Sequence, residues 1–286
     1  MRRLVGLTVA LAVAVLAGIA ALGFVEARSD PIQRKATVGL PGWPAGAAPI
    51  KVALISDIHI GDAVMDPARL SRIVGQVEAV KPDLIVLAGD FVVGRNAFGV
   101  DARAKLLTVP LTGLKAPLGT LAVLGNHDHW TGARQVTAAL TAAGVTVLDN
   151  QSVQRGPIVV AGIDDDFSGH DDVAEAMASS VRLGGPIVAF THSPDLAPML
   201  PPGVPLLLAG HTHCGQIVLP LIGPPFPVRS PYEGGRRLYD PRYRCGLVRD
   251  PGRTVIVTAG VGSGTLPIRI GAPPDYWLIT LGPSSR

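Results

Sequence analysis

The stretch VALISDIH, residues 52–59, contains the pattern that decides the fold. It is a short apolar run followed at once by two side chains, Asp57 and His59, that can bind a metal ion. A short apolar run of this kind is typical of a buried β-strand. In α/β sheets, ligands gather beyond the carboxyl ends of the strands. The stretch therefore predicts a strand whose end carries part of a metal site.

Four further apolar runs are arranged in the same way, over residues 84–89, 121–125, 187–191 and 206–210. The side chains that follow them are Asp90, Asn126, His127, Asp128, His192, His211 and His213. Taken alone, Asp-x-His and Gly-Asp motifs are common in surface turns. All five blocks in this order, each behind an apolar run, favour one crowded site over surface turns and satisfied core histidines.

The segments between these runs predict an α/β protein. Helical spacing of apolar residues indicates helices over 67–80, 132–143 and 171–181, which alternate with the strands. Beyond residue 213 the pattern changes to short strands joined by loops rich in Gly and Pro. The strands expected there are 216–218, 255–258 and 277–281.

The candidate ligands are two carboxylates, one amide and four imidazoles, from Asp57, His59, Asp90, Asn126, His192, His211 and His213. This mixture suits Mn, Fe or Zn and is too rich in nitrogen for a calcium or magnesium cage. One ion rarely needs seven protein ligands, whereas two ions that share a bridging carboxylate use about that many. Two ions roughly 3.5–4 Å apart can hold a water as hydroxide and clamp the oxygens of a phosphoryl group.

With its blocks D-x-H, G-D, G-N-H-D, H and G-H-x-H, the sequence resembles the calcineurin-like metallophosphoesterase superfamily over residues 50–281. The resemblance implies a four-layer α/β/β/α sandwich. It also implies two metal ions, one held by Asp57, His59 and His213, the other by Asn126, His192 and His211, with Asp90 bridging both.

The same resemblance implies catalytic roles for His127 and Asp128. In the family this histidine faces the substrate, where it stabilises the transition state or protonates the leaving oxygen. Imidazole is chemically suited to that work. Asp128 would orient His127 by a hydrogen bond.

Three further residues are expected near the substrate. Arg95 and Arg269 could bind phosphate oxygens in bidentate fashion, although most surface arginines do nothing of the kind. His129, directly after the Asn-His-Asp block, could line the substrate entrance. The alternative for His129 is that it packs against the next helix or caps it.

The N-terminal residues 4–25 carry no charge and are rich in Ala, Val, Leu and Gly. At about 1.5 Å per residue they can cross a hydrocarbon core of about 30 Å. Arg2 and Arg3 favour a cytoplasmic N-terminus, which places the rest of the chain outside the cytoplasm. The alternative is a cleaved signal peptide, which would leave a secreted or periplasmic protein. The expected organisation is a membrane anchor or signal over 1–28, a linker over 29–48 and a catalytic domain over 49–286.

A narrower resemblance concerns residues 210–216 and 266–269. These are similar to the bacterial membrane-associated branch of the superfamily, which includes phosphodiesterases and some pyrophosphohydrolases of lipid A synthesis. More familiar members carry Gly where this chain has Cys214. Cys214 and Cys245 are the chain's two cysteines, and they either form a disulfide or remain two buried thiols.

We therefore expect a membrane-tethered, extracytoplasmic phosphohydrolase with two divalent or trivalent metal ions (Mn, Fe or Zn). A metal-bridging hydroxide would attack a phosphoester or diphosphate, and the tether makes a lipid-linked substrate plausible. The alternatives are a soluble-substrate phosphomonoesterase, a cyclic-nucleotide phosphodiesterase, and a non-catalytic scaffold, which should lack ligands that this chain retains. The net charge is +3, and without Arg2 and Arg3 there are 23 basic against 22 acidic residues, so no nucleic-acid partner is expected.

Overall fold

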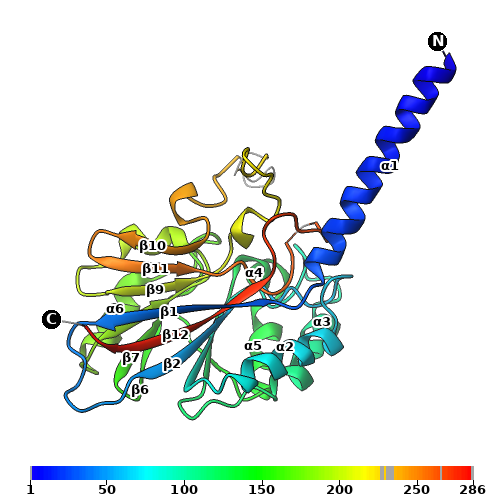
Figure 1. Ribbon diagram of the computed structural model, residues 1–286. Helices are drawn as coiled ribbons and strands as arrows, with labels where there is room; N and C mark the ends of the chain where they lie inside the picture. Colours follow the sequence, from blue (N-terminus) through cyan, green and yellow to red (C-terminus); the bar gives the residue numbers. More distant parts are fainter. Residues whose placement is uncertain (1, 226–228, 230–234, 265, 285–286) are drawn as a thin grey trace.

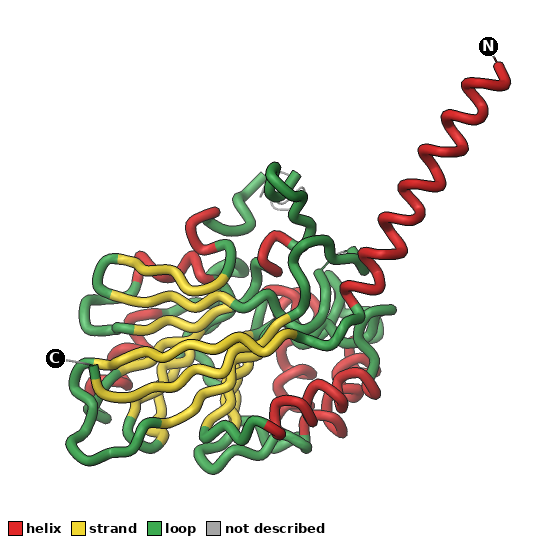
Figure 2. The backbone as a smooth tube through the Cα atoms, in the orientation of Figure 1, coloured by secondary structure: helices red, strands yellow, loops and turns green. Residues whose placement is uncertain are grey.

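Two six-stranded β-sheets pack face to face, with helices on both outer faces, in the computed structural model (Figures 1 and 2). The structure describes residues 2–225, 229, 235–264 and 266–284. The strand order is β1-β12-β2-β3-β4-β5 in the first sheet and β10-β11-β9-β8-β7-β6 in the second. The expected α/β/β/α sandwich is confirmed.

The first sheet combines a parallel centre with one inserted antiparallel strand. Its members are β1 (Ile32–Leu40), β2 (Ile50–Ile55), β3 (Leu84–Ala88), β4 (Thr120–Val123), β5 (Thr146–Val147) and β12 (Asp275–Pro283). Strands β2, β3, β4 and β5 run parallel, so β2, β3 and β4 end at the same edge of the sheet. Strand β12 lies antiparallel to β2 and parallel to β1.

The outer face of the first sheet is covered by helices α2 (Pro67–Ala79), α3 (Val100–Leu111) and α5 (Ala133–Ala142). Helix α2 begins where Asp66 accepts a hydrogen bond from the backbone of Arg69, with Pro67 in the first turn. Its buried face includes Leu70, Ile73 and Val77, at the spacing that predicted it. The expected helices over 67–80 and 132–143 are thus confirmed within a residue or so.

The second sheet lies across the core from the first. Its strands are β6 (Gln151–Arg155), β7 (Ile158–Gly162), β8 (Ile187–Phe190), β9 (Leu206–Ala209), β10 (Gly246–Asp250) and β11 (Arg253–Val257). Strands β7, β8, β9 and β11 are parallel. Helix α6 (Val173–Val181) and the 3-10 helix η1 (Pro194–Met199) cover its outer face, where Ala176 and Leu196 are buried.

The core between the sheets explains why the five runs are continuously apolar. Leu54, Val86, Leu121, Phe190 and Leu208 all meet in this layer and are buried. Strands covered on both faces have no solvated side, so they lack the alternation of a half-exposed strand. All five runs form strands: β2, β3, β4, β8 and β9.

Several elements differ from the expectation. The segment 29–48, expected to be a linker, contains β1, an edge strand that pairs only with β12 and leaves most of its side chains at least partly exposed. An edge strand buries little, so its sequence carries a weak apolar signal. The expected strand over 216–218 is a single bridge between Ile217 and Ile270. Helices α3 and α4 (Asn126–Thr131) were not anticipated.

Helix α1 (Arg2–Ala27) projects away from the sandwich (Figure 1). Its segment Val5–Ala27 is long and apolar enough to cross a membrane, and it is exposed except near its end, where Gly23 and Ala27 are buried. The base of the helix is fixed to the domain. The Gly23 carbonyl accepts from the backbone N–H of Arg269 at 2.9 Å. The buried guanidinium of Arg69 donates to the carbonyls of Ala27 at 3.1 Å and Ser29 at 2.8 Å.

Candidate metal centre

The loops that follow the strand ends of both sheets meet at one edge of the sandwich. In the first sheet, the backbone N–H of Asp57 donates to Gly89 at 2.9 Å, and that of His59 donates to Asp90 at 3.0 Å. In the second sheet, the backbone N–H of Gly210 donates to His192 at 3.0 Å. The β-ladders therefore continue past the strands and fix the loops that carry the candidate ligands.

Five of the seven candidate ligands have a backbone conformation that such residues rarely adopt. Their φ angles are 52° for Asp57, 48° for His59, 56° for Asp90, 69° for His211 and 48° for His213. A non-glycine residue held in this left-handed region costs on the order of 1–3 kcal/mol, and such strain clusters at functional sites. The surrounding tertiary structure therefore holds these residues in a backbone conformation that their local preferences disfavour.

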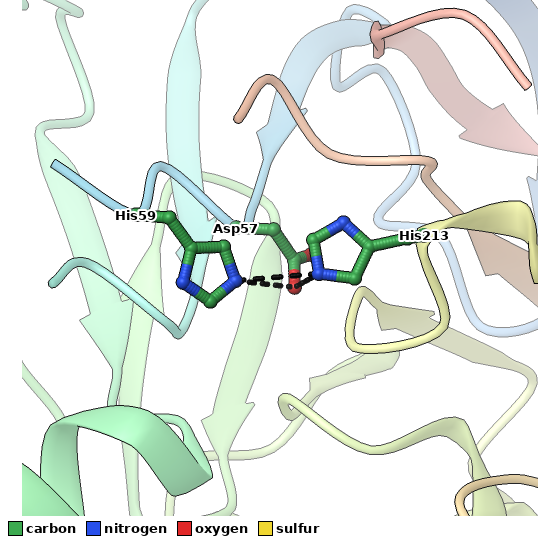
Figure 3. Close-up of side chains that lie close together, drawn as sticks. All are labelled: Asp57, His59 and His213. Carbon is green, nitrogen blue, oxygen red and sulfur yellow. Dashed lines mark hydrogen bonds and ion pairs between the residues drawn. The ribbon is translucent and has the colours of Figure 1, made fainter. Parts of the chain in front are cut away.

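A first cluster consists of Asp57, His59 and His213, all buried (Figure 3). Asp57 Oδ1 lies 3.8 Å from His59 Nε2 and 3.4 Å from His213 Nε2, and the two nitrogens are 3.3 Å apart. Ligand atoms at about 2.1 Å from one tetrahedral ion lie about 3.4 Å from each other. The three atoms therefore have the spacing of ligands around a single cation.

A second cluster surrounds Asp90. Its Oδ2 lies 3.2 Å from His192 Nε2 and 3.5 Å from His59 Nε2, so it contacts the first cluster as well. His211 Nδ1 lies 3.2 Å from His192 Nε2. Asn126, the first residue of α4, is buried, and the next residue, His127, donates its backbone N–H to Asp90 Oδ1 at 2.8 Å. Asp90 thus lies between the two groups, as a bridging ligand must.

The donor atoms fit metal ions chemically. Asp57 Oδ1 and Asn126 Oδ1 are buried and have no hydrogen-bond partner, which is costly unless a cation satisfies them. Burial lowers the pKa of His59 and of His211 to about 3. These imidazoles are therefore neutral at physiological pH, as metal ligation requires.

His192 shows how strongly the site attracts positive charge. Burial lowers the pKa of His192, but the adjacent Asp90 carboxylate outweighs this effect and raises the pKa well above its ordinary value. Protonated His192 therefore supplies a positive charge beside Asp90, where a metal ion would supply one. A metal ion would displace that proton.

Each candidate histidine ligand of the second sheet is oriented by a contact to the ring nitrogen that faces away from the cluster. His192 Nδ1 is 2.7 Å from the carbonyl of Ala88, and His211 Nε2 is 2.8 Å from that of Leu238. His213 Nδ1 is 3.1 Å from Arg269 Nη2. Such outer partners fix the ring and leave the opposite nitrogen for a metal.

His127 lies beside the clusters without joining either. Its Nδ1 is 2.6 Å from the Gly94 carbonyl, so Nδ1 carries a hydrogen and Nε2 remains for a substrate. Its ring centroid is 4.9 Å from that of His59, and its backbone N–H donates to Asp90 at 2.8 Å. The loop after β3 therefore positions His127 relative to the bridging carboxylate.

Asp128 does not hydrogen-bond His127, contrary to the expectation. Its carboxylate accepts from the backbone N–H groups of Phe91, Val92 and Gly125 at 2.9, 3.2 and 3.0 Å. The reason is its place in the first turn of α4, where an acidic side chain turns back to cap the helix. Asp128 thus ties the loops after β3 and β4 together, and the Gly94 carbonyl orients His127.

Arg269 is also placed differently from the expectation, because it is fully buried. Its guanidinium donates to the carbonyls of Gly262, Ala272 and Ala259 as well as to His213. It positions a candidate ligand and does not face a substrate.

His129 packs against the segment after β7, which neither expectation named. It binds Asp164 at 2.9 Å, stacks on His170 at 3.7 Å between centroids, and has a side chain that is 9% exposed. Arg95 is exposed, with its guanidinium 4.9 Å from the ring centroid of Trp130.

Cys214, next to His213, forms a disulfide with Cys245. The bridge ties the His211–His213 loop to the segment that carries Leu238, whose carbonyl orients His211. Thr212 Oγ1 adds a hydrogen bond to the carbonyl of Arg244 at 2.7 Å. No sequence signal marks the Gly94 and Leu238 carbonyls, since any residue type offers the same backbone oxygen.

Comparisons with known proteins agree with this geometry. The sequence profile of the family described as calcineurin-like phosphoesterase matches residues 50–215. The chain is 32% identical to an uncharacterized metallophosphoesterase of Aquifex aeolicus, over 86% of this chain and 90% of that protein. It is 32% identical to phosphodiesterase YaeI of Escherichia coli, over 82% and 83%. It is 29% identical to a transmembrane protein with metallophosphoesterase domain of Danio rerio, over 95% of this chain and 62% of that protein.

Proposed function

This chain belongs to the calcineurin-like phosphoesterase family, and from that premise we propose that it hydrolyses lipid-linked phosphodiesters or diphosphates at a membrane surface outside the cytoplasm. The main support for this proposal is the position of Asp90, whose Oδ2 lies within 3.5 Å of nitrogens from both clusters. A shared carboxylate between two sets of buried ligands is the arrangement that a two-metal phosphoesterase needs.

The donor set suits Mn, Fe or Zn. In this assignment Asp57, His59 and His213 hold one ion, Asn126, His192 and His211 hold the other, and Asp90 bridges them. When bound, the two ions supply a water of lowered pKa as the nucleophile and neutralise charge on the phosphoryl oxygens.

The chain's own contribution to the chemistry is made by His127. With Nδ1 held by the Gly94 carbonyl, Nε2 is the nitrogen that meets the substrate. With hydrogens on both nitrogens, as an imidazolium, the ring donates through Nε2 a hydrogen bond to a phosphoryl oxygen or a proton to the leaving oxygen. Asp90 accepts a hydrogen bond from the backbone N–H of His127 and so keeps the imidazole at a fixed position relative to the ligands.

A membrane-borne substrate is supported by how the base of α1 is attached. Arg69 donates to the Ala27 carbonyl at the end of the helix and to the Val261 carbonyl at 2.9 Å. The backbone N–H of Val261 donates in turn to Ser56, the residue before Asp57, at 3.1 Å. One side chain and one backbone step therefore separate the membrane helix from a candidate ligand.

Two observations support the compartment and the bond type. The Cys214–Cys245 disulfide is suited to an oxidising compartment outside the cytoplasm. The name of the Escherichia coli relative supports phosphodiesters over phosphomonoesters.

The test uses the full chain in lipid nanodiscs, stripped with chelator and reloaded with Mn, Fe or Zn. We expect metal-dependent hydrolysis of bis-p-nitrophenyl phosphate that exceeds hydrolysis of p-nitrophenyl phosphate, and none in Asp57→Asn. A phospholipid-linked p-nitrophenyl diester in the same disc should be cleaved faster than its short-chain soluble analogue. Equal rates for the phospholipid-linked ester and its soluble analogue would contradict a lipid-linked substrate. Absence of metal binding would contradict the whole proposal.

A further inference from the structure

The base of α1 fixes how close the sandwich comes to a membrane. Within the apolar segment Val5–Ala27, Gly23 and Ala27 are buried, whereas Leu22 is 72% exposed. The part that is free to enter lipid, residues 5–22, is about 27 Å long at about 1.5 Å per residue. The hydrocarbon core of a bilayer is about 30 Å thick. A bilayer that covers this part of α1 therefore reaches the domain at Gly23.

The segment of the domain that packs on Gly23 adjoins exposed apolar side chains. A Cβ atom at Gly23 would lie 3.1 Å from the Arg269 carbonyl oxygen and 3.2 Å from the Ile268 side chain. Glycine thus lets α1 pack directly on this segment. Leu266, two residues before Ile268, is 48% exposed. An exposed leucine therefore lies close to the level at which α1 enters lipid.

A second loop is held beside this segment by backbone pairing. The backbone N–H of Val218 donates to the Ile270 carbonyl at 2.7 Å, and that of Ile270 donates to Gln216 at 2.9 Å. A tight turn follows, in which the backbones of Leu219 and Gly223 hydrogen-bond in both directions at 2.9 Å. Figure 1 shows the yellow segment after β9 rising beyond the sheets on the side from which α1 projects. The turn therefore lies on the membrane side of the domain.

The tip of this turn is unfavourable in water. Leu221 is fully exposed and Ile222 is 73% exposed. Leu221 also has a φ of 66°, a left-handed conformation that a bulky residue rarely adopts. Glycine, asparagine or aspartate would suit both the backbone and the solvent at such a position. Residues 217–224 include no charged side chain. An exposed apolar tip of this kind is typical of a surface that contacts a membrane or a partner.

We propose that Leu221 and Ile222, together with Leu266, enter the lipid bilayer beside α1 and attach the domain to the membrane a second time. This inference rests on the proposed function, which places α1 in a bilayer. A single membrane helix can tilt, and the domain would tilt with it. A helix and a loop together fix which edge of the sandwich faces the lipid. The turn begins a few residues after His213, so that edge is the one that carries the metal centre. A phosphodiester in the headgroup layer then reaches the candidate ligands without leaving the membrane.

The test introduces a tryptophan at the tip, in the full chain reconstituted into nanodiscs of brominated or unbrominated phosphatidylcholine. Bromine quenches indole emission on contact, and the wild type gives the emission of the three natural tryptophans, which is subtracted. In Leu221→Trp, brominated lipid should remove about half of the added emission, because interfacial apolar anchors reach roughly 5–10 Å into the bilayer.

Val181→Trp is the matched control. Val181 is 78% exposed and ends α6, ahead of the start of β8, whereas the metal centre follows the ends of the strands. Its added emission should not be quenched by brominated lipid.

Leu11→Trp, within α1, separates the possible outcomes, and none of these measurements depends on catalysis. If Leu11→Trp is quenched but Leu221→Trp loses no more emission than Val181→Trp, the loop does not enter lipid. That result overturns the inference and leaves the tether and the phosphodiesterase intact. If Leu11→Trp is not quenched, α1 is not in the bilayer, and the membrane location in the proposed function is contradicted together with the inference.

Leu221→Asp gives the functional readout, because a charge at the tip opposes insertion. Hydrolysis of the phospholipid-linked p-nitrophenyl diester in the disc should fall by about tenfold, the factor for withdrawing one leucine from apolar surroundings. Hydrolysis of bis-p-nitrophenyl phosphate should stay at the wild-type rate, and Val181→Asp should change neither rate. An unchanged rate for the phospholipid-linked ester in Leu221→Asp would contradict a role of the loop in orienting the site.

Discussion

The two sheets hold their shares of the metal centre by different means. In the first sheet, Asp57 and His59 are fixed by backbone hydrogen bonds to the adjacent loop after β3, a direct extension of the ladder between neighbouring strands. In the second sheet, His211 and His213 depend on contacts from distant segments: the Leu238 carbonyl, the Arg269 guanidinium and the Cys214–Cys245 disulfide. The first half is thus held by strand pairing, and the second by strand pairing together with these tertiary contacts.

Because their supports differ, the two halves should fail separately. A ligand in the first half is fixed as firmly as the β-sheet itself, because the hydrogen bonds that place it are backbone bonds. A ligand in the second half is fixed only as firmly as its remote partner. Asp90 contacts nitrogens from both halves, His59 from the first and His192 from the second.

The largest effect is expected for Asp90→Asn, which breaks both halves at once. Removal of the shared charge should lower the affinity for both ions by more than about a hundredfold. This exceeds the loss of metal affinity that follows when only a residue hydrogen-bonded to a ligand is removed. Turnover should fall by more than about 10⁴-fold, which exceeds the decrease in rate expected when a general acid is removed. Metal content after gel filtration, with kcat, measures this. Asp101→Asn, at an exposed position of α3, is the control. An Asp90→Asn variant that retains one tightly bound ion would argue against bridging.

The next effect is expected for His127→Ala, which leaves both halves intact. Loss of the donor should reduce kcat by about 10²- to 10⁴-fold while two ions remain bound. Steady-state kinetics and metal analysis on the same sample test this. His170→Ala removes an exposed histidine and should change neither quantity. Unchanged turnover in His127→Ala would falsify the assigned role.

A smaller and one-sided effect is expected for Cys245→Ser. Release of the segment that carries Leu238 should weaken the ion held by His192 and His211 by about tenfold, the lower end for loss of an outer partner. The ion held by Asp57, His59 and His213 should weaken less, because two of its three ligands are fixed by backbone hydrogen bonds to the loop after β3. Two-site calorimetric titration resolves the two affinities. The wild type treated with dithiothreitol should behave like the variant; equal weakening of both sites would contradict the contrast between the halves.

The smallest effect concerns the ion pair that joins the halves, His129 on α4 and Asp164 after β7. Burial lowers the pKa of His129, but its hydrogen bond with Asp164 outweighs this and raises the pKa above the ordinary value. The pair therefore contributes stability that is fully present below pH about 6.5 and is lost as pH rises through the folded-state pKa.

His129→Gln tests this pair because glutamine stays neutral at every pH. The variant should be destabilised by about 1–2 kcal/mol at pH 6 and by less at pH 9, in metal-free protein. Thermal unfolding across that range measures the difference. Asp164→Asn should show the same trend. A difference from wild type that grows with pH would reverse the sign and refute the charged pair.

The contrast between the halves also explains what the sequence could predict. The strands and their terminal ligands were predictable because β2, β3, β4, β8 and β9 are buried on both faces, which requires continuous apolar runs. Edge strand β1 was missed for the opposite reason. The outer partners were missed because Gly94 and Leu238 act through their carbonyls, and Arg269 resembles a surface arginine until its burial is known.

The position of β12 in the first sheet has a consequence for the order of assembly. It lies between β1 and β2, with Asp275 opposite Ile32 and Leu281 opposite Ile50. At about 5–20 residues per second, synthesis delivers β12 on the order of tens of seconds after β1. During that interval β1 has no neighbour to pair with. Arg269 and Val261, which brace the ligands and the base of α1, also arrive late. The nascent chain thus contains every candidate ligand well before it can hold them in place.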